Sequence, residues 1–166
     1  MRISFDLDDT LRMHGESYDL DPNKVPLLLR TLFKERFRKG TYELLHQLQN
    51  SAHEICVYTT SSRSEFYIKW WFFFYGIKLS LIINDKRHAK AVKPQGMERA
   101  PSKNPAKFGI DLHIDDLPGV AIEGQRHGFD VLILDPDDPS WTDKVISAVE
   151  LKEQSQISPL STPSPL

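Results

Sequence analysis

Cysteine is nearly absent from this sequence of 166 residues, in which Cys56 is the only one. An internal disulfide and a zinc cluster built from thiolates are therefore excluded. The formal net charge of −2 gives no overall attraction to nucleic acid or to an acidic membrane surface. The longest apolar run, residues 70–77, is too short to span a bilayer, and residues 1–9 lack the layout of a signal peptide. We therefore expect a cytoplasmic protein with no membrane partner.

Short apolar segments alternate with helical patterns along the chain. Buried strands are predicted at residues 3–7, 54–60, 79–83, 111–114 and 131–134. Helices are predicted at residues 25–37, after a cap at Thr41, after a capping box of Ser62 and Glu65, at residues 118–127, and after a cap at Thr142. This alternation implies parallel pairing with both faces of the sheet covered. We predict an α/β fold, a Rossmann-like three-layer sandwich with a central, mostly parallel five-stranded sheet.

The length fits one domain. We assign residues 1–153 to it and expect residues 154–166, rich in serine and proline, to be a disordered tail. Residues 85–107 show no apolar period and contain several prolines, which predicts a loop.

Acidic and hydroxyl side chains gather where the predicted strands end. They are Asp6 and Asp8 after the first strand, Thr59 and Thr60 after the second, and Asp115 and Asp116 at the end of the fourth. Ligands of such sheets bind at the carboxyl ends of the strands. Carboxylates collected at one edge repel one another, and a hard cation relieves that repulsion. Oxygen ligands without a histidine or cysteine cluster favour Mg²⁺.

These residue types support one reaction. Asp6 would attack phosphorus and form an acyl phosphate, while Asp8 would protonate the leaving oxygen and later activate water. A lysine and a hydroxyl would bind the phosphoryl oxygens, and Mg²⁺ would neutralise the two anions that must approach each other. The pattern predicts a magnesium-dependent phosphatase that hydrolyses a phosphomonoester.

The run Phe5-Asp6-Leu7-Asp8-Asp9-Thr10-Leu11 resembles the first motif of the haloacid dehalogenase (HAD) superfamily, a large group of aspartate-dependent phosphohydrolases. The resemblance implies that Asp6 is the nucleophile, Asp8 the general acid/base, and Thr10 the support of the turn between them. It also implies that the Asp6 carboxylate and the backbone carbonyl of Asp8 bind the metal.

Three further motifs of the superfamily follow in order. The second is a hydroxyl after an apolar strand, here Thr59, with Thr60 as the alternative. The third is a lysine before the fourth strand, where we favour Lys103 over Lys107. The fourth is a pair of acids, here Asp115–Asp116, and the sequence does not distinguish which of the two binds the metal directly.

Members of the superfamily often carry a cap domain over the site. Residues 12–38 and 85–107 occupy the two usual insertion points and are too short for a full cap domain, which predicts an open site of the capless type. Basic residues dominate the second segment: Lys86, Arg87, Lys90, Lys93, Arg99, Lys103 and Lys107. They form either a positive rim that attracts an anionic substrate or a solvated loop. The expected substrate is a nucleotide, a nucleic-acid end, a phosphoprotein or a small phosphate ester.

Residues 66–75 are apolar nearly all round, which is typical of a buried helix. One sheet face cannot cover every side of it, so we consider a homodimer contact through the aromatic helix 65–75. Two other functions compete with the phosphatase. A phospho-aspartate receiver domain places its phosphorylated aspartate on the third strand, which ends differently here. A non-catalytic phosphate-binding scaffold on the same fold stays open.

Overall fold

The computed structural model describes residues 1–15, 17–92 and 100–157. Its centre is a five-stranded sheet in the order β3-β2-β1-β4-β5. The strands are β1 (Arg2–Phe5), β2 (Glu54–Tyr58), β3 (Leu79–Ile83), β4 (Leu112–Asp115) and β5 (Val131–Ile133). Every neighbouring pair is parallel, so the predicted fold class is confirmed.

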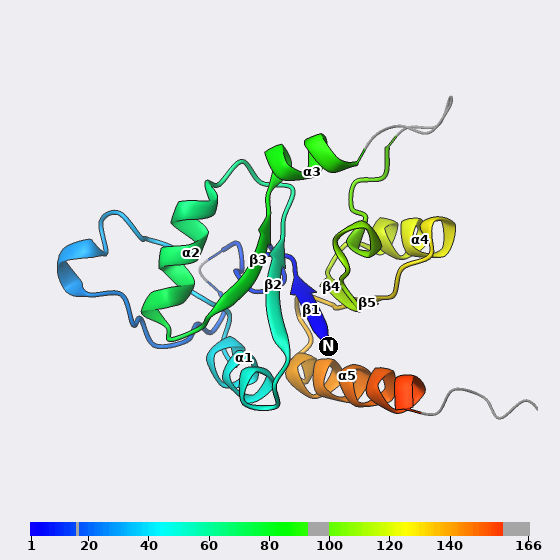
Figure 1. The fold of residues 1–166 in the computed structure, drawn as a ribbon. Helices are drawn as coiled ribbons and strands as arrows, with labels where there is room; N and C mark the ends of the chain where they lie inside the picture. The colour runs from blue at the N-terminus through cyan, green and yellow to red at the C-terminus, as the bar shows by residue number, and fades with distance from the viewer. Residues whose placement is uncertain (16, 93–99, 158–166) are drawn as a thin grey trace, which may run out of the picture.

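Helices cover both faces of this sheet. They are α1 (Thr41–Asn50), α2 (Glu65–Phe74), α3 (Asp85–Ala91), α4 (Pro118–His127) and α5 (Trp141–Ile157). Figure 1 shows α1 and α5 side by side on one face, with α4 on the other. Leu44 of α1, Trp71 of α2 and Val145 of α5 belong to one buried cluster. The result is the expected three-layer sandwich.

The position of β1 explains where a site can form. β1 lies between β2 and β4, and the chain builds the sheet outward in one direction from β1 to β3 and in the other from β4 to β5. Ile3 and Phe5 are fully buried because helices cover both faces. The carboxyl ends of β1 and β4 therefore flank the topological switch point, where such folds bind ligands.

The first helix begins differently from the prediction. Gly40, not Thr41, is its N-cap residue, with a φ of 91° that favours glycine. The capping carboxylate comes from Asp21, whose two oxygens accept the N–H groups of Gly40 (2.9 Å) and Tyr42 (2.7 Å). A cap supplied from a distant segment cannot be read from the local pattern, so the prediction of a Thr41 cap was wrong.

Two further caps also shift along the chain. The predicted capping box of Ser62 with Glu65 was wrong, because Ser64 is the N-cap of α2 and accepts the N–H of Tyr67. The last helix begins at Trp141, so Thr142 lies within its first turn. That helix extends to Ile157 and includes the first four residues assigned above to a tail, 154–157; residues 158–166 lie outside the described part of the chain.

The segment 85–107 is not entirely a loop, as α3 occupies its beginning. Asn84 caps α3 by accepting the N–H of Arg87, and this short helix buries none of its side chains, which explains the missing apolar period. Lys86, Arg87 and Lys90 are exposed on or beside it. Residues 93–99, with Lys93 and Arg99, lie outside the described residues.

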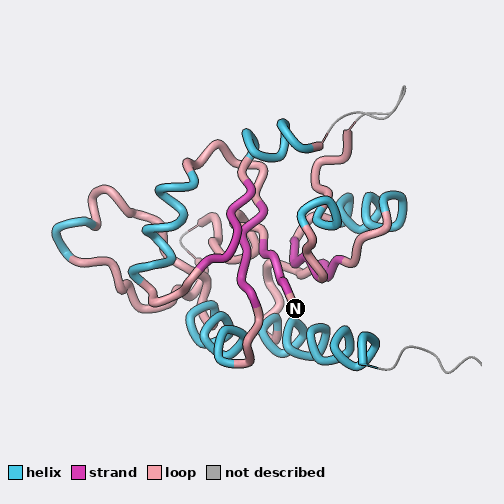
Figure 2. Tube along the Cα trace, viewed as in Figure 1, coloured by secondary structure: helices cyan, strands magenta, loops and turns pink. Residues whose placement is uncertain are grey.

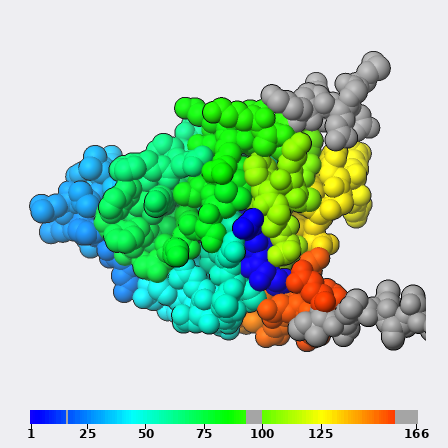
Figure 3. All heavy atoms as spheres, in the orientation of Figure 1, coloured from blue at the N-terminus to red at the C-terminus, as the bar shows by residue number. Residues whose placement is uncertain are grey.

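The helix predicted at residues 25–37 was wrong. Only the short 3₁₀ helix η1 (Leu27–Leu29) forms there. Pro26 favours an extended Val25, and the apolar residues divide between the core and the surface instead of forming one stripe. The segment runs out and back, with an antiparallel bridge between Leu20 and Arg38 (Figure 2). Its tip projects from the body next to α2 (Figure 3). No separate cap domain is present in the described residues, as predicted.

None of the helices within the described ranges has both the length and the apolar character needed to cross a bilayer.

Candidate active site

A lysine and two aspartates from three segments meet at the carboxyl edge of the sheet. Asp6 follows β1 and Asp115 ends β4. Lys103 Nζ lies 2.8 Å from Asp6 Oδ1, at an angle outside hydrogen-bond geometry, and 2.5 Å from Asp115 Oδ2. All three side chains are almost fully buried. A buried cation between two carboxylates compensates charges that could not be buried alone.

Both carboxylate oxygens of Asp115 accept hydrogen bonds from other groups of the protein. Its Oδ2 accepts hydrogen bonds from Lys103 and from His113 Nε2 (2.9 Å), and its Oδ1 accepts the N–H of Leu117 (2.9 Å). His113 Nδ1 in turn lies 2.8 Å from the hydroxyl of Ser4. Burial acts to raise the pKa of Asp115, but His113 and Lys103 outweigh it and lower that pKa to about 2. Asp115 is therefore a fixed carboxylate.

Asp6 has the opposite electrostatic character. Burial raises its pKa to about 6; Lys103 acts against that rise, and the neighbouring charge of Asp115 adds to it. The raised pKa means that burial disfavours the anionic form of Asp6. Further positive charge beside Asp6 would stabilise that anion. A perturbed carboxyl group at a ligand-binding edge is typical of a functional site.

Asp116 completes an oxygen cluster that fits a divalent cation. Asp6, Asp115 and Asp116 each offer a carboxylate oxygen, and these atoms lie within 4.8 Å of one another. Asp116 is half-buried and accepts the Thr10 hydroxyl at 3.2 Å. Burial and the charge of Asp115 raise the pKa of Asp116. A cluster of oxygen donors with excess negative charge matches Mg²⁺ better than a soft metal.

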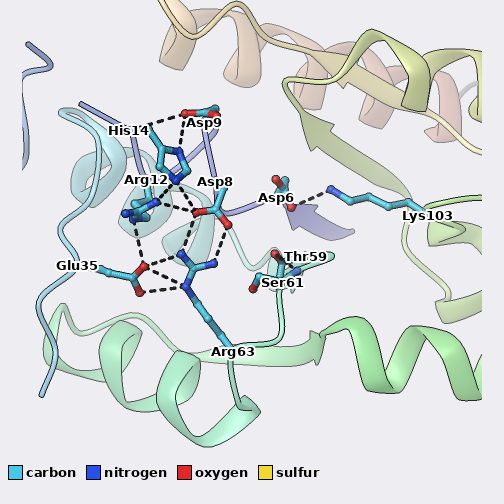
Figure 4. A network of polar contacts seen from close by, with 10 residues as sticks. All are labelled: Asp6, Asp8, Asp9, Arg12, His14, Glu35, Thr59, Ser61, Arg63 and Lys103. Carbon is cyan, nitrogen blue, oxygen red and sulfur yellow. Dashed lines mark hydrogen bonds and ion pairs between the residues drawn. The ribbon is translucent and has the colours of Figure 1, made fainter.

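Two hydroxyls lie next to Asp6 at the end of β2 (Figure 4). Thr59 is buried, and its Oγ1 accepts the N–H of Ser61. The Ser61 Oγ is buried and has no hydrogen-bond partner in the described part of the structure. Thr60 is exposed. The structure thus places Thr59 and Ser61, and not Thr60, beside Asp6.

Lys103 and Lys107 are clearly separated by their surroundings. Lys107 is exposed in the 3₁₀ helix η2 (Pro105–Phe108), whereas Lys103 lies two residues before that helix and reaches Asp6. Its backbone is held in place because the Asn104 N–H donates to the Tyr58 hydroxyl (2.9 Å) and the Lys103 N–H donates to Glu123 (3.2 Å). The structure thus favours Lys103.

Asp8 lies in a separate cluster of charges, shown in Figure 4. Arg63 donates to Asp8 twice, from Nη1 to Oδ2 at 2.6 Å and from Nη2 to Oδ1 at 2.9 Å. Arg12 donates to Oδ1 at 2.9 Å. Burial alone would raise the pKa of Asp8, but Arg63 and then Arg12 lower it. In this arrangement Asp8 is an ionised carboxylate, which suits a general base better than a general acid.

Glu35 is the second partner of Arg63. It comes from the 12–38 segment and accepts from Arg63 Nε and Nη2 at distances of 2.6–3.1 Å. Arg12 Nε also lies 3.1 Å from Glu35. The ion cluster of Asp8, Arg12, Glu35 and Arg63 therefore joins the loops after β1 and β2 to the 12–38 segment.

Sequence reasoning gave no role to His113, to the two arginines that pair with Asp8 (Arg12 and Arg63), or to Glu35, which pairs with both arginines. His113 could have been found, because it lies two residues before Asp115 and period-two alternation places both on one face of a strand. Arg63 follows the hydroxyl run after β2 and so belongs to an edge loop. Glu35 carries no local signal, since its position depends on the path of the whole 12–38 segment.

No protein-family model matches the chain, and no curated protein sequence matches it. Solved structures do resemble it. One is a HAD-superfamily hydrolase, subfamily IA, variant 1, from Geobacter sulfurreducens, with a TM-score of 0.54 and 12% identity over 89% of this chain and 95% of that chain. At this identity the likeness concerns the fold alone, and it confirms the HAD-type fold that the motifs predicted.

Two other solved structures are similar to the chain at lower TM-scores. The HAD domain of the effector protein Lem4 from Legionella pneumophila has a TM-score of 0.48 and 15% identity, covering 90% of this chain and 93% of that chain. A predicted HAD-like family hydrolase from Porphyromonas gingivalis has a TM-score of 0.47 and 13% identity, covering 90% and 97%.

Proposed function

We propose that this protein is a phosphatase that hydrolyses a phosphomonoester through an aspartyl-phosphate intermediate on Asp6, with Mg²⁺ as cofactor. The observation that carries the proposal is the buried contact of Lys103 with both Asp6 and Asp115, beside Asp116, at the carboxyl edge of the sheet. A nucleophilic carboxylate, a fixed cation and a group of metal-binding oxygens are thereby collected from distant parts of the chain.

Each step assigns a role to a side chain of the protein. An oxygen of Asp6 forms a bond to phosphorus as the bond from phosphorus to the leaving oxygen breaks, and the minor, protonated form of Asp8 donates its proton to that oxygen. Water then attacks the phosphorus of the acyl phosphate, Asp8 takes its proton, and Asp6 and inorganic phosphate are released. Lys103 and the Thr59 hydroxyl stabilise the negative charge of the phosphoryl oxygens.

The residues that would hold Mg²⁺ are Asp6, Asp116 and the backbone carbonyl of Asp8. Bound there, the ion would neutralise negative charge on the nucleophile and on the phosphate. Asp116 is preferred to Asp115 because Lys103, His113 and the Leu117 N–H already occupy the oxygens of Asp115.

The range of substrates stays broad in this proposal. The described residues form no cap domain, which supports a substrate that can be large, such as a nucleotide, a nucleic-acid end or a phosphoprotein, as well as a small phosphate ester.

A homodimer through the helix 65–75 stays a prediction. Phe66 and Phe73 of α2 are well exposed, so they are accessible for such a contact.

The proposal is tested by screening phosphorylated metabolites and polymers, with 4-nitrophenyl phosphate as a generic substrate and Mg²⁺ present. Asp6→Asn should lower turnover by at least about 10³-fold, because the nucleophile is lost. Asp130→Asn removes an exposed carboxylate that pairs with Lys152 and serves as the matched control, with unchanged turnover. Full turnover by Asp6→Asn would reject the mechanism.

A non-catalytic phosphate-binding scaffold is the second candidate, favoured by the arrangement of Asp8. Its carboxylate is engaged by two arginines instead of being free for proton transfer. Binding of Mg²⁺ and phosphate without turnover of any substrate in the screen would support the scaffold and reject the phosphatase.

A further inference from the structure

The ion cluster around Asp8 assigns roles to two residues outside the expected motifs. We propose that Arg63 is a positioning residue for Asp8 and that Glu35 positions Arg63. This inference rests on the proposed phosphatase function and concerns the delivery of the proton to the leaving group.

The geometry fixes the carboxylate of Asp8 in one plane. Arg63 donates to both of its oxygens, at 2.6 Å and 2.9 Å, and a planar guanidinium that binds both oxygens defines their orientation as well as their position. Arg12 approaches only Oδ1. Orientation of Asp8 therefore depends mainly on Arg63, whose side chain is about one-fifth exposed.

Glu35 holds Arg63 from its other side. It accepts hydrogen bonds from Nε and Nη2 of Arg63 at 2.6–3.1 Å. A planar guanidinium that binds one carboxylate along each of two edges has a single orientation. Glu35 therefore fixes the plane in which Arg63 meets Asp8.

The arrangement also gives a role to the 12–38 segment. Glu35 reaches the site because that segment runs out and returns beside the loop after β1, where Arg12 also contacts Glu35 at 3.1 Å. The segment is too short to form a cap domain. It supplies instead the Glu35 carboxylate, which binds the arginine that holds Asp8. Glu35 acts through Arg63 and does not contact the reacting atoms in this arrangement.

The experiment compares two substrates that differ in their need for an acid. The leaving group of an alkyl phosphate is a basic alkoxide, which needs a proton. The leaving group of 2,4-dinitrophenyl phosphate is a weakly basic phenolate, which departs without one. If Arg63 positions Asp8, Arg63→Lys lowers kcat/KM for the alkyl phosphate by at least about 10-fold and changes the value for the dinitrophenyl ester by less than about 3-fold. The ratio of the two values does not depend on the fraction of folded protein.

Glu35→Gln tests the second half of the proposal. It should shift the same ratio in the same direction by a smaller factor, and most of that shift should disappear when Arg63 is already lysine, because the hydrogen bonds of Glu35 go to Arg63. The ion pair of Glu35 with Arg12, which also contacts Asp8, accounts for the remainder. The matched control is Glu54→Gln/Arg2→Lys, which should leave the ratio unchanged. Arg2 and Glu54 form an exposed ion pair at the amino ends of β1 and β2, away from the site.

The outcomes separate this inference from the proposed function. If the wild-type protein hydrolyses both esters and Arg63→Lys lowers both values equally, the positioning role of Arg63 is rejected and the phosphatase stands. If the two single effects multiply in the double variant, the role of Glu35 as a positioning residue for Arg63 is rejected. If the wild-type protein hydrolyses neither these esters nor any substrate of the screen described above, the proposed function fails and the inference fails with it. Should Arg63→Lys not fold, Glu35→Gln alone decides through the same ratio.

Discussion

At the scale of single residues, the buried charge of Asp6 lowers the stability of the folded protein. Burial raises the pKa of Asp6 from 3.8 to about 6, so above pH 6 the native protein holds an anion that the unfolded chain ionises more easily. The free energy of unfolding therefore falls as pH rises from about 4 to about 6 because of this group. Functional sites commonly carry such a cost, since the same charge is needed for binding and catalysis.

Replacing Asp6 by asparagine should remove that cost. Without divalent metal, we expect Asp6→Asn to be more stable than the wild type by about 2–3 kcal/mol at pH 7.5, with the difference shrinking towards zero near pH 4. Urea unfolding between pH 4.5 and pH 8 in EDTA measures it, and this range avoids the titration of Asp115. Asp130→Asn is the control. A stability difference that does not change with pH would contradict the assigned burial of the Asp6 charge.

Among the features of the candidate site, the placement of the acidic residues was the most predictable. Asp6, Asp115 and Asp116 follow apolar strands, so period and position alone brought them to one edge. The surroundings of Asp8 were not predictable, because Arg63 and Glu35 are 55 and 27 residues away from it in the sequence. Sequence spacing indicates which carboxylates meet, but their protonation depends on partners that only the complete fold supplies.

At the scale of the elements, the start of α1 depends on a carboxylate from outside the helix. Asp21 is almost fully buried, and its oxygens accept the N–H groups of Gly40 and Tyr42. The first N–H groups of a helix have no partner within it, and a carboxylate there also interacts favourably with the helix dipole. The cap links the 12–38 segment to the layer formed by α1 and α5.

We expect Asp21→Ala to lower the free energy of unfolding by about 2 kcal/mol, because two buried N–H groups lose their acceptor. Asp19→Ala is the matched control, because Asp19 is exposed and pairs with Lys39 at the surface, so its loss should cost less than about 0.5 kcal/mol. Denaturant unfolding measures both. Equal effects of the two substitutions would show that the Asp21 cap contributes no special stability.

The errors in predicted elements share one physical cause. The strands and α4 agree within a few residues because their patterns are local, with Pro118 in the first turn of α4 and Gly128 after its end. α3 escaped detection since it buries nothing, and residues 25–37 read as a helix although their apolar side chains serve two different environments. Where tertiary contacts decide an element, the local pattern is a weak guide.

At the scale of the whole molecule, the sheet brings three negative oxygens together, and the global stability should report what binds them. Asp6, Asp115 and Asp116 repel one another in the metal-free protein, apart from the compensation that Lys103 gives the first two. A cation that binds only the native state stabilises it by about 2.7 kcal/mol at a concentration 100 times its Kd. Millimolar Mg²⁺ should therefore raise the thermal unfolding midpoint by several degrees at pH 7.5.

The pH dependence and a variant identify the site of that effect. Protons compete with the cation for Asp6, whose pKa is about 6, so the increase caused by Mg²⁺ should be smaller at pH 5 than at pH 7.5. Asp116→Asn should largely abolish it, whereas Asp130→Asn should keep it, and sodium chloride at equal ionic strength should not reproduce it. Differential scanning fluorimetry with these variants needs no substrate. An equal increase in Asp116→Asn, or one that grows as the pH falls, would mean that Mg²⁺ stabilises the protein elsewhere than at these carboxylates.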